Sequence, residues 1–274
     1  MFYKKVPPSP LLTGYVECYY VWEHENTSGK VFEVESPPSA YTAFVFNYGD
    51  DYSVSSKNSE KQFVSKQFLV GQLTKSYSLH FPGQIGTAVI VFKPTGISSI
   101  FKIPMFAFTN ERIDLRAFID SSAVEALSKK INCHTTPEEK IIALEEFLLE
   151  YLQMNNPAPD VIDKAANLIV EKHGQVNINE LCSQLYISRR QFERKFLYKV
   201  GLSPKFYARM RRIGYICYQI AGKKAVNWQD LYYDLDYYDQ SHFIKDFTEF
   251  TGRSPREYFN NNAELIHHLK MENN

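Results

Sequence analysis

The C-terminal part of the chain contains one twenty-residue framework twice, and this repeat constrains the fold more than any other feature. The first copy is SRRQFERKFLYKVGLSPKFY, residues 188–207, and the second, DQSHFIKDFTEFTGRSPREY, follows 51 positions later at residues 239–258. The copies share two phenylalanines four residues apart, a glycine, a Ser-Pro pair and a tyrosine. Phenylalanines at this spacing lie on one helix face, glycine ends helices, and Ser-Pro begins them. The sequence therefore predicts two copies of one helical unit.

The first copy has the pattern of a helix-turn-helix, in which a short helix, a tight turn and a second helix follow one another. Ser188 can cap the second helix, and Phe192 and Phe196 lie on one face of it. Arg190 and Arg194 lie on the opposite face. A helix with one aromatic and one arginine-rich face can enter the major groove, where guanidinium groups bridge guanine O6 and N7. An ordinary helical hairpin would account for one copy, but two copies at a fixed offset favour a tandem DNA-binding unit.

Charge is distributed unevenly between the copies, although the whole chain has 31 basic and 31 acidic residues. Residues 181–225 contain 11 Lys and Arg and a single acid, Glu193, which can accept a hydrogen bond from a cytosine amino group. This concentration of positive charge favours a polyanionic partner. Residues 226–260 instead contain 3 basic and 7 acidic residues. We therefore expect the second copy to gain little from counterion release and to bind DNA loosely or not at all.

Residues 236–258, DYYDQSHFIKDFTEFTGRSPREY, resemble the motif that ends the tandem helix-turn-helix domain of the AraC/XylS family of bacterial transcription regulators. The resemblance extends over the last hundred residues and both copies. It implies a regulator that binds double-stranded DNA in a sequence-specific manner, and it admits RNA polymerase and a second copy of the chain (a homodimer) as further partners. The sequence departs from the family at Asp236, where glycine is usual, and at Tyr232, where small residues are usual.

The resemblance also implies DNA contacts at individual positions. In the first copy the expected contacts are Arg189, Arg190, Gln191, Glu193 and Arg194. In the second copy they are Gln240, Ser241, His242 and Lys245. Phosphate groups are expected at Lys199, Ser203, Lys205 and Ser254. The two serines begin helices, whose free backbone N–H groups favour anions.

Residues 1–120 have the composition of a β-rich domain. β-branched and aromatic residues dominate residues 15–25, 41–49, 67–73 and 86–94, and turn-forming segments separate them. Strands at this spacing favour an antiparallel sandwich or small barrel. The family resemblance, less specific here, implies a cupin-like sensor domain that binds an effector.

The remaining domain boundaries follow from the change to helical periodicity. We expect a helical connector over residues 121–154, a linker at residues 155–160, and an all-α tandem helix-turn-helix domain over residues 161–262, so the predicted fold class is α+β. Thr136, Pro137 and Glu139 carry the signals of a helix start. The apolar stripe of the following helix, residues 137–153, suits dimerisation and covering of the barrel equally well.

Few residues of the N-terminal domain point to a ligand. Trp22, Tyr41 and His80 are candidates for lining an effector pocket, although aromatic residues at alternating strand positions more often belong to a core. His24 and His80 each stand alone, without a second histidine or an acid at metal-ligand spacing. We therefore expect neither a metal ion nor another cofactor.

The sequence carries no sign of catalysis, because GxSxG, phosphate-binding glycine series and Cys/His clusters are absent. A regulator without enzymatic activity is the interpretation that we favour. Three others stay open: a sensor whose degenerate helix-turn-helix domain binds protein, a cupin-type metalloenzyme fused to a DNA-binding domain, and a nucleic-acid-binding protein that needs no ligand.

The chain also has the features of a cytoplasmic protein. Its N-terminal residues lack the apolar segment of a signal peptide, and no apolar run is long enough to span a membrane. Cys18, Cys133, Cys182 and Cys217 are scattered, which is typical of buried thiols in a reducing compartment.

Overall fold

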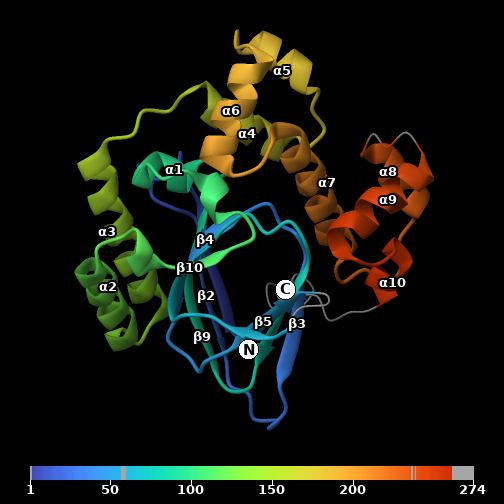
Figure 1. The fold of residues 1–274 in the computed structure, drawn as a ribbon. Coiled ribbons are helices and arrows are strands. Elements are labelled where there is room, and N and C mark those ends of the chain that lie inside the picture. The colour runs from blue at the N-terminus through green and yellow to red at the C-terminus, as the bar shows by residue number, and fades with distance from the viewer. Residues whose placement is uncertain (1, 57–59, 236, 238, 261–274) are drawn as a thin grey trace.

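A computed structural model describes residues 2–56, 60–235, 237 and 239–260. Figure 1 shows an N-terminal part built from β-sheets with flanking helices and a C-terminal part built from helices alone. The α+β fold class that the sequence predicts is therefore confirmed. None of the described helices is long and apolar enough to cross a membrane.

The N-terminal part contains two antiparallel sheets. The first has the strand order β1 (Phe2–Val6), β2 (Val16–His24), β9 (Ile85–Phe92), β4 (Thr42–Asn47), β7 (Gln67–Val70) and β10 (Arg112–Asp114). The second has the order β3 (Phe32–Ser36), β8 (Tyr77–Phe81), β5 (Ser53–Ser56) and β6 (Gln62–Phe63). The four segments predicted as strands form β2, β4, β7 and β9, which pair with one another inside the first sheet.

Two apolar cores lie on opposite faces of the first sheet. One, between the sheets, contains Trp22 and Phe68 with Val34 and Phe81 from the second sheet. The other lies under the flanking helices and includes Phe44, whose ring packs on Phe92 and Phe101 in an aromatic cluster. Alternate residues of each strand point to opposite faces, so the alternation of apolar residues supplies both cores.

Five helical segments complete the N-terminal part: α1 (Gly96–Phe101), η1 (Met105–Phe108), η2 (Leu115–Ala117), α2 (Ser121–Cys133) and α3 (Pro137–Asn155). The capping box predicted for α3 is present, because Thr136 and Glu139 each accept a backbone hydrogen bond from the other. Helix α3 extends two residues beyond the predicted end. Helices α1 and η1 lie in the segment expected to be β-rich. The sequence patterns did not predict these two helices. Among the cysteines, Cys133 is exposed at the end of α2, so its predicted burial is wrong.

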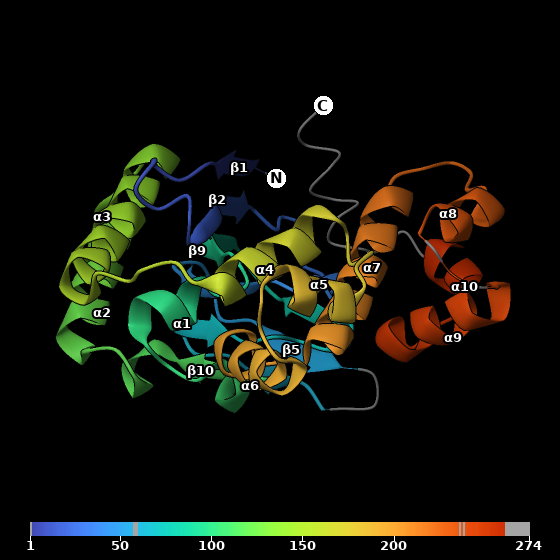
Figure 2. The same cartoon turned by 90° about the horizontal axis from the view of Figure 1, so that it is seen from above.

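The C-terminal part follows the predicted order of helices. They are α4 (Val161–Glu171), α5 (Ile178–Gln184), α6 (Arg189–Val200), α7 (Pro204–Ile220), α8 (Trp228–Asp234), α9 (Gln240–Thr251) and α10 (Pro255–Asn260). Seen from above in Figure 2, α4 to α7 lie between α1–α3 on one side and α8–α10 on the other. Asp236 and residues 261–262 of the predicted domain lie outside the described residues.

Helix ends in the two copies form as the repeated framework predicts. Ser188 caps α6 and Asp239 caps α9, each by accepting a backbone N–H three residues ahead. Gly201 and Gly252 end these helices with φ values of 93° and 74°, a conformation that residues with a side chain rarely adopt. Tyr232 is buried and stacks on Phe243 at 6.1 Å, so the bulky residue at this position fills the space between α8 and α9.

Candidate nucleic-acid interface

Helix α6 presents the two faces that its sequence predicts. Phe192, Phe196 and Val200 are fully buried, and the two phenylalanine rings are 5.4 Å apart. Arg190 and Arg194 are exposed on the other side and make no hydrogen bond or ion pair with any described residue. The buried stripe therefore fixes the helix, and the two guanidinium groups remain available to bases or phosphates.

The start of α6 contains a small polar network. Arg189 pairs with Glu193 at 3.0 Å along the helix and donates to the side chain of Asn179 in α5, also at 3.0 Å. Glu193, predicted to accept from cytosine, thus has a basic partner within the protein. Gln191 is exposed between them, and its N–H is the one that Ser188 caps. The expected DNA contacts of the first copy lie together at one end of the unit.

Helix α9 repeats this arrangement, with mostly neutral polar side chains in place of the arginines. Phe243 and Phe247 are buried with ring centroids 5.8 Å apart. Gln240, Ser241, His242 and Lys245 are all exposed. The residues that the sequence assigns to DNA contacts are thus accessible in this copy too.

The acidic residues of the second copy are largely engaged within the protein. Arg209 of α7 binds Asp246 at 2.8 Å and Glu249 at 2.5 Å, and its hydrogen bond with Asp246 raises the pKa of the guanidinium. Asp239 caps α9, and Glu257 closes a ring of hydrogen bonds with Ser254 at the start of α10. The surface of α9 is consequently less negative than a charge count over residues 226–260 suggests.

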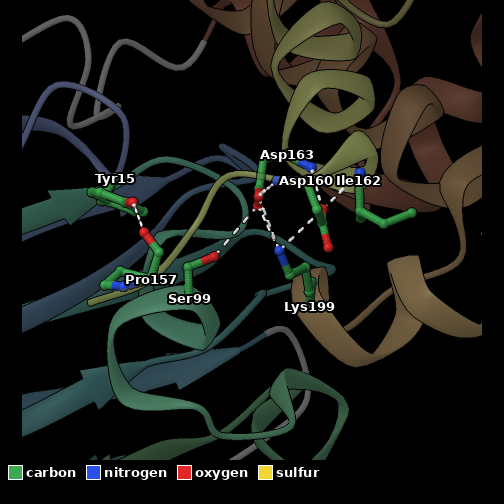
Figure 3. Close-up of polar contacts among 7 residues, drawn as sticks. All are labelled: Tyr15, Ser99, Pro157, Asp160, Ile162, Asp163 and Lys199. Atoms are coloured by element: carbon green, nitrogen blue, oxygen red, sulfur yellow. Dashed lines mark hydrogen bonds and ion pairs between the residues drawn. The ribbon is translucent and has the colours of Figure 1, made fainter. Parts of the chain in front are cut away.

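A polar cluster, shown in Figure 3, joins α6 to the start of α4 and the start of α4 to the sheet domain. The ammonium group of Lys199 lies 2.9 Å from Asp163 and 3.1 Å from Asp160, both at the start of α4. Ser99 of α1 donates to Asp163 at 3.4 Å, and the hydroxyl of Tyr15 donates to the carbonyl of Pro157 at 2.7 Å. Lys199 was predicted to meet a DNA phosphate, but here it is turned inward, because two carboxylates hold it.

Further along, η1 packs against the C-terminal end of α6. Tyr198 packs its ring against Phe106 and donates its hydroxyl to the carbonyl of Lys102 at 3.3 Å. Thr109 donates to the carbonyl of Gly201 at 2.7 Å. A Cβ at Gly201 would lie only 2.8 Å from the carbonyl oxygen of Met105, so this close approach also depends on glycine.

Helix α7 is attached to the segment between β3 and β4. Arg211 donates to the carbonyl of Ser39 at 2.9 Å and lies over the ring of Tyr41 at 4.5 Å. Tyr207, the tyrosine of the framework in the first copy, donates its hydroxyl to the carbonyl of Ala40 at 3.1 Å. Tyr41, a candidate for lining an effector pocket, therefore lies in a contact between domains.

The second copy has its own contacts with the sheets. Arg253 forms an ion pair with Glu35 of β3. The N–H of Ser76 donates to the carbonyl of Phe250 at 3.1 Å, and Lys75 donates to the carbonyl of Glu249. Burial raises the pKa of Glu35, whereas the charge of Arg253 lowers it, and burial dominates. Helices of both copies are thus tied to the same sheet domain.

The three predicted pocket residues do not come together. Trp22 is buried between the sheets with its ring 5.3 Å from that of Phe81. His80 is only 5% exposed, and its Nε2 lies 2.8 Å from the hydroxyl of Ser55. Across the described residues, no three His, Cys, Asp or Glu side chains gather as a set of metal ligands.

Two family models match the sequence. Residues 4–114 match a domain of unknown function, DUF6597, and residues 181–261 match a helix-turn-helix domain. No curated protein sequence is significantly similar to the chain.

The fold is also similar to solved structures at low sequence identity. ToxT from Vibrio cholerae is 13% identical, with 88% of this chain and 97% of ToxT covered and a TM-score of 0.45. A ToxT structure bound to (E)-4-(8-methylnaphthalen-1-yl)but-3-enoic acid is 13% identical, with coverages of 94% and 98% and a TM-score of 0.47. The AraC-like transcriptional activator CuxR is 14% identical, with coverages of 77% and 85% and a TM-score of 0.26. Identification of the family rests on the helix-turn-helix model and the repeated motif rather than on these superpositions.

Proposed function

The chain belongs to the AraC family of transcription regulators, and from this premise we propose that α6 and α9 bind duplex DNA under the control of the sheet domain. The observation that carries the proposal is that the two helices have the same arrangement of buried and exposed side chains. Each buries a pair of phenylalanines and exposes polar or basic residues on the opposite side. Such a helix can contact base edges in the major groove.

The two helices have unequal tasks in this proposal. Arg190 and Arg194 supply unpaired guanidinium groups for guanine, with Arg189, Gln191 and Glu193 at the same end of α6. Helix α9 supplies mostly neutral donors and acceptors, which suit weaker contacts with base edges. These groups belong to Gln240, Ser241, His242 and Lys245. Ser203, Lys205 and Ser254 lie at the starts of α7 and α10 and serve phosphates there.

Control by the sheet domain acts through its contacts with α6, α7 and α9. An effector that changes those contacts would change the relative placement of the two reading helices. Contacts at Thr109, Arg211 and Arg253 support this proposal, because they join both copies to the sheet domain.

We place this activity in the cytoplasm, where DNA and RNA polymerase are accessible. The proposed activity includes no catalytic step. A second copy of the chain would dock on α3, where Ile142 and Met154 are 55% and 74% exposed. We also propose that domain boundaries lie at residues 120, 154 and 160.

Selection from random duplexes tests the function without a known operator. Full-length protein is mixed with a library of random-sequence DNA duplexes, and the retained duplexes are sequenced. We expect enrichment of one sequence motif, with Lys129→Ala on α2 as a control that leaves enrichment unchanged because Lys129 lies outside both copies. Retention without an enriched motif, or no retention, would contradict sequence-specific binding.

A further inference from the structure

A hollow of about 400 Å³ opens between the edges of the two sheets. Strand β10 closes the first sheet on this side and β6 the second, and the hollow lies between β10, β5 and the segment joining β7 to β8. Its volume is within the range of small-molecule sites in proteins. Polar side chains dominate the lining, among them Ser55, Thr74, Lys75, Tyr77, Asn110 and Arg112.

Arg112 is the main chemical feature of the hollow. Its guanidinium group lies 4.4 Å from the centre of the Tyr77 ring, which orients the guanidinium plane. Its Nη2 is buried and donates to no described residue. None of the lining residues carries a carboxylate, so this cation has no acidic partner within the site. A buried, unpaired donor on an arginine favours a planar oxyanion, which two parallel hydrogen bonds can hold.

Two neighbouring groups add donors of the same kind. The Asn110 side-chain oxygen accepts from the N–H and the hydroxyl of Thr74 at 2.8 and 2.9 Å, and the NH₂ of this amide donates to none of the residues that the structure describes. Lys75 contributes an exposed ammonium group at the rim. The hollow therefore combines two cations and an amide donor.

We propose that this hollow binds the carboxylate or phosphate group of a small anionic effector, with Arg112 as the primary contact and Lys75 and Asn110 as secondary contacts. The inference rests on the proposed function insofar as the anion is an effector. The binding site itself does not depend on DNA binding.

Lys75 connects the site to the second helix-turn-helix. Its ammonium group donates to the carbonyl of Glu249 near the end of α9, and the next residue, Ser76, donates its N–H to the carbonyl of Phe250. An anion in the hollow competes for Lys75 and withdraws it from α9. Binding therefore loosens the contact between the sheet domain and the second reading helix.

Calorimetric titration of the full-length protein tests the site. Benzoate and inorganic phosphate are the probes for the two anion types, and benzamide is the neutral match for benzoate. We expect saturable binding of at least one anion, no binding of benzamide, and a loss of affinity of about tenfold or more in Arg112→Gln. Arg116→Gln is the matched control, because Arg116 pairs with Asp114 and does not line the hollow.

Binding of benzoate indicates that the effector carries a carboxylate group, and binding of phosphate indicates that it carries a phosphate group. Saturation by neither anion, equal binding of benzamide, or unchanged affinity in Arg112→Gln would each overturn the site. An anion affinity that persists in a protein that selects no DNA would refute the proposed function and leave the site intact.

Hydrogen exchange measures the connection to α9. With the bound anion, exchange at the Ser76 amide should become faster, since its acceptor Phe250 moves away. Unchanged or slower exchange at Ser76 under saturating anion would overturn the coupling.

Discussion

At the scale of single residues, the repeated framework builds the same aromatic cluster twice. Phe196 packs on Phe192 and Tyr207 at 5.4 and 5.7 Å. In the second copy, Phe247 packs on Phe243 and Tyr258 at 5.8 and 5.4 Å. The phenylalanines and tyrosine of the repeated framework thus hold α6 against α7 and α9 against α10.

Replacing the central ring tests this packing. Phe196→Ala should lower the free energy of unfolding by about 3–5 kcal/mol, because a fully buried aromatic side chain leaves a cavity. Denaturant unfolding measures the loss. Leu197→Ala, at the exposed neighbouring position, should change the same quantity by about 0.5 kcal/mol or less. Equal losses in the two variants would contradict the assigned core.

Arg194 is the residue whose loss should affect DNA binding most specifically. Arg194→Ala should weaken binding to the selected duplex by about 1–3 kcal/mol and relax preference at one base position. Fluorescence anisotropy on single-base variants of the duplex measures both effects. An unchanged affinity and base preference would remove Arg194 from the reading surface.

At the scale of elements, α7 joins the two copies through charge as well as through the chain. Arg209 on α7 holds Asp246 and Glu249 on α9, and Asp246 is buried. The seventeen residues of α7 span about 25 Å at the ordinary rise of a helix. The position of α9 relative to α6 therefore depends on both the length of α7 and this ion pair.

Arg209→Met should lower the free energy of unfolding by about 3–5 kcal/mol, because it removes the guanidinium partner of the buried Asp246 carboxylate and leaves only the imidazole of His242, 3.9 Å away. The double variant Arg209→Met/Asp246→Leu should recover much of the loss, since the uncompensated charge is removed. Thermal and denaturant unfolding of both variants give these values. A single variant as stable as the unaltered protein would contradict the role of the pair.

The Lys199 cluster should make stability depend on acid pH. Burial alone would raise the pKa of Asp160, but hydrogen bonding and charge from Lys199 outweigh it and lower the pKa below the ordinary value of 3.8. A lowered pKa in the folded state adds stability above the ordinary pKa, and that stability is lost as the pH falls through the folded value.

Comparison with Lys199→Met isolates this contribution. The difference in unfolding free energy between the two proteins should be constant near neutral pH and should shrink below about pH 4. Urea unfolding across the pH range provides the measurement. A difference that grows on acidification would have the wrong sign for this ion pair.

At the scale of the whole molecule, the sheet domain contacts α6, α7 and α9. Its loops hold α6 through Thr109, α7 through Ala40 and Ser39, and α9 through Ser76. Most of these contacts join a side chain or N–H to a backbone carbonyl of the other part.

The local features of the fold could be predicted from the sequence, because their causes are local. Ser188, Thr136 and Asp239 cap helices through their own side chains, and Phe192 and Phe196 mark a buried face by spacing alone. The contacts between domains could not be predicted in this way. Every residue has a carbonyl, so nothing in the sequence singles out Ser39 or Gly201 as an acceptor.

Charge counting had a related limit. It assigned a negative character to the second copy, although Arg209 neutralises two of its acids within the fold. The family resemblance likewise implied a phosphate contact at Lys199, although Asp160 and Asp163 hold its ammonium group within the fold. Both outcomes depend on partners distant in the sequence, which only the folded chain brings together.

The footprint of the full-length protein on its selected duplex tests the central claim most directly, because that claim assigns DNA contacts to both α6 and α9. Hydroxyl-radical cleavage should reveal two protected segments about one helical turn, or 10 base pairs, apart. Arg194→Ala should weaken protection of one segment and Lys245→Ala protection of the other. A single protected segment that Lys245→Ala leaves unchanged would contradict a second reading helix in α9.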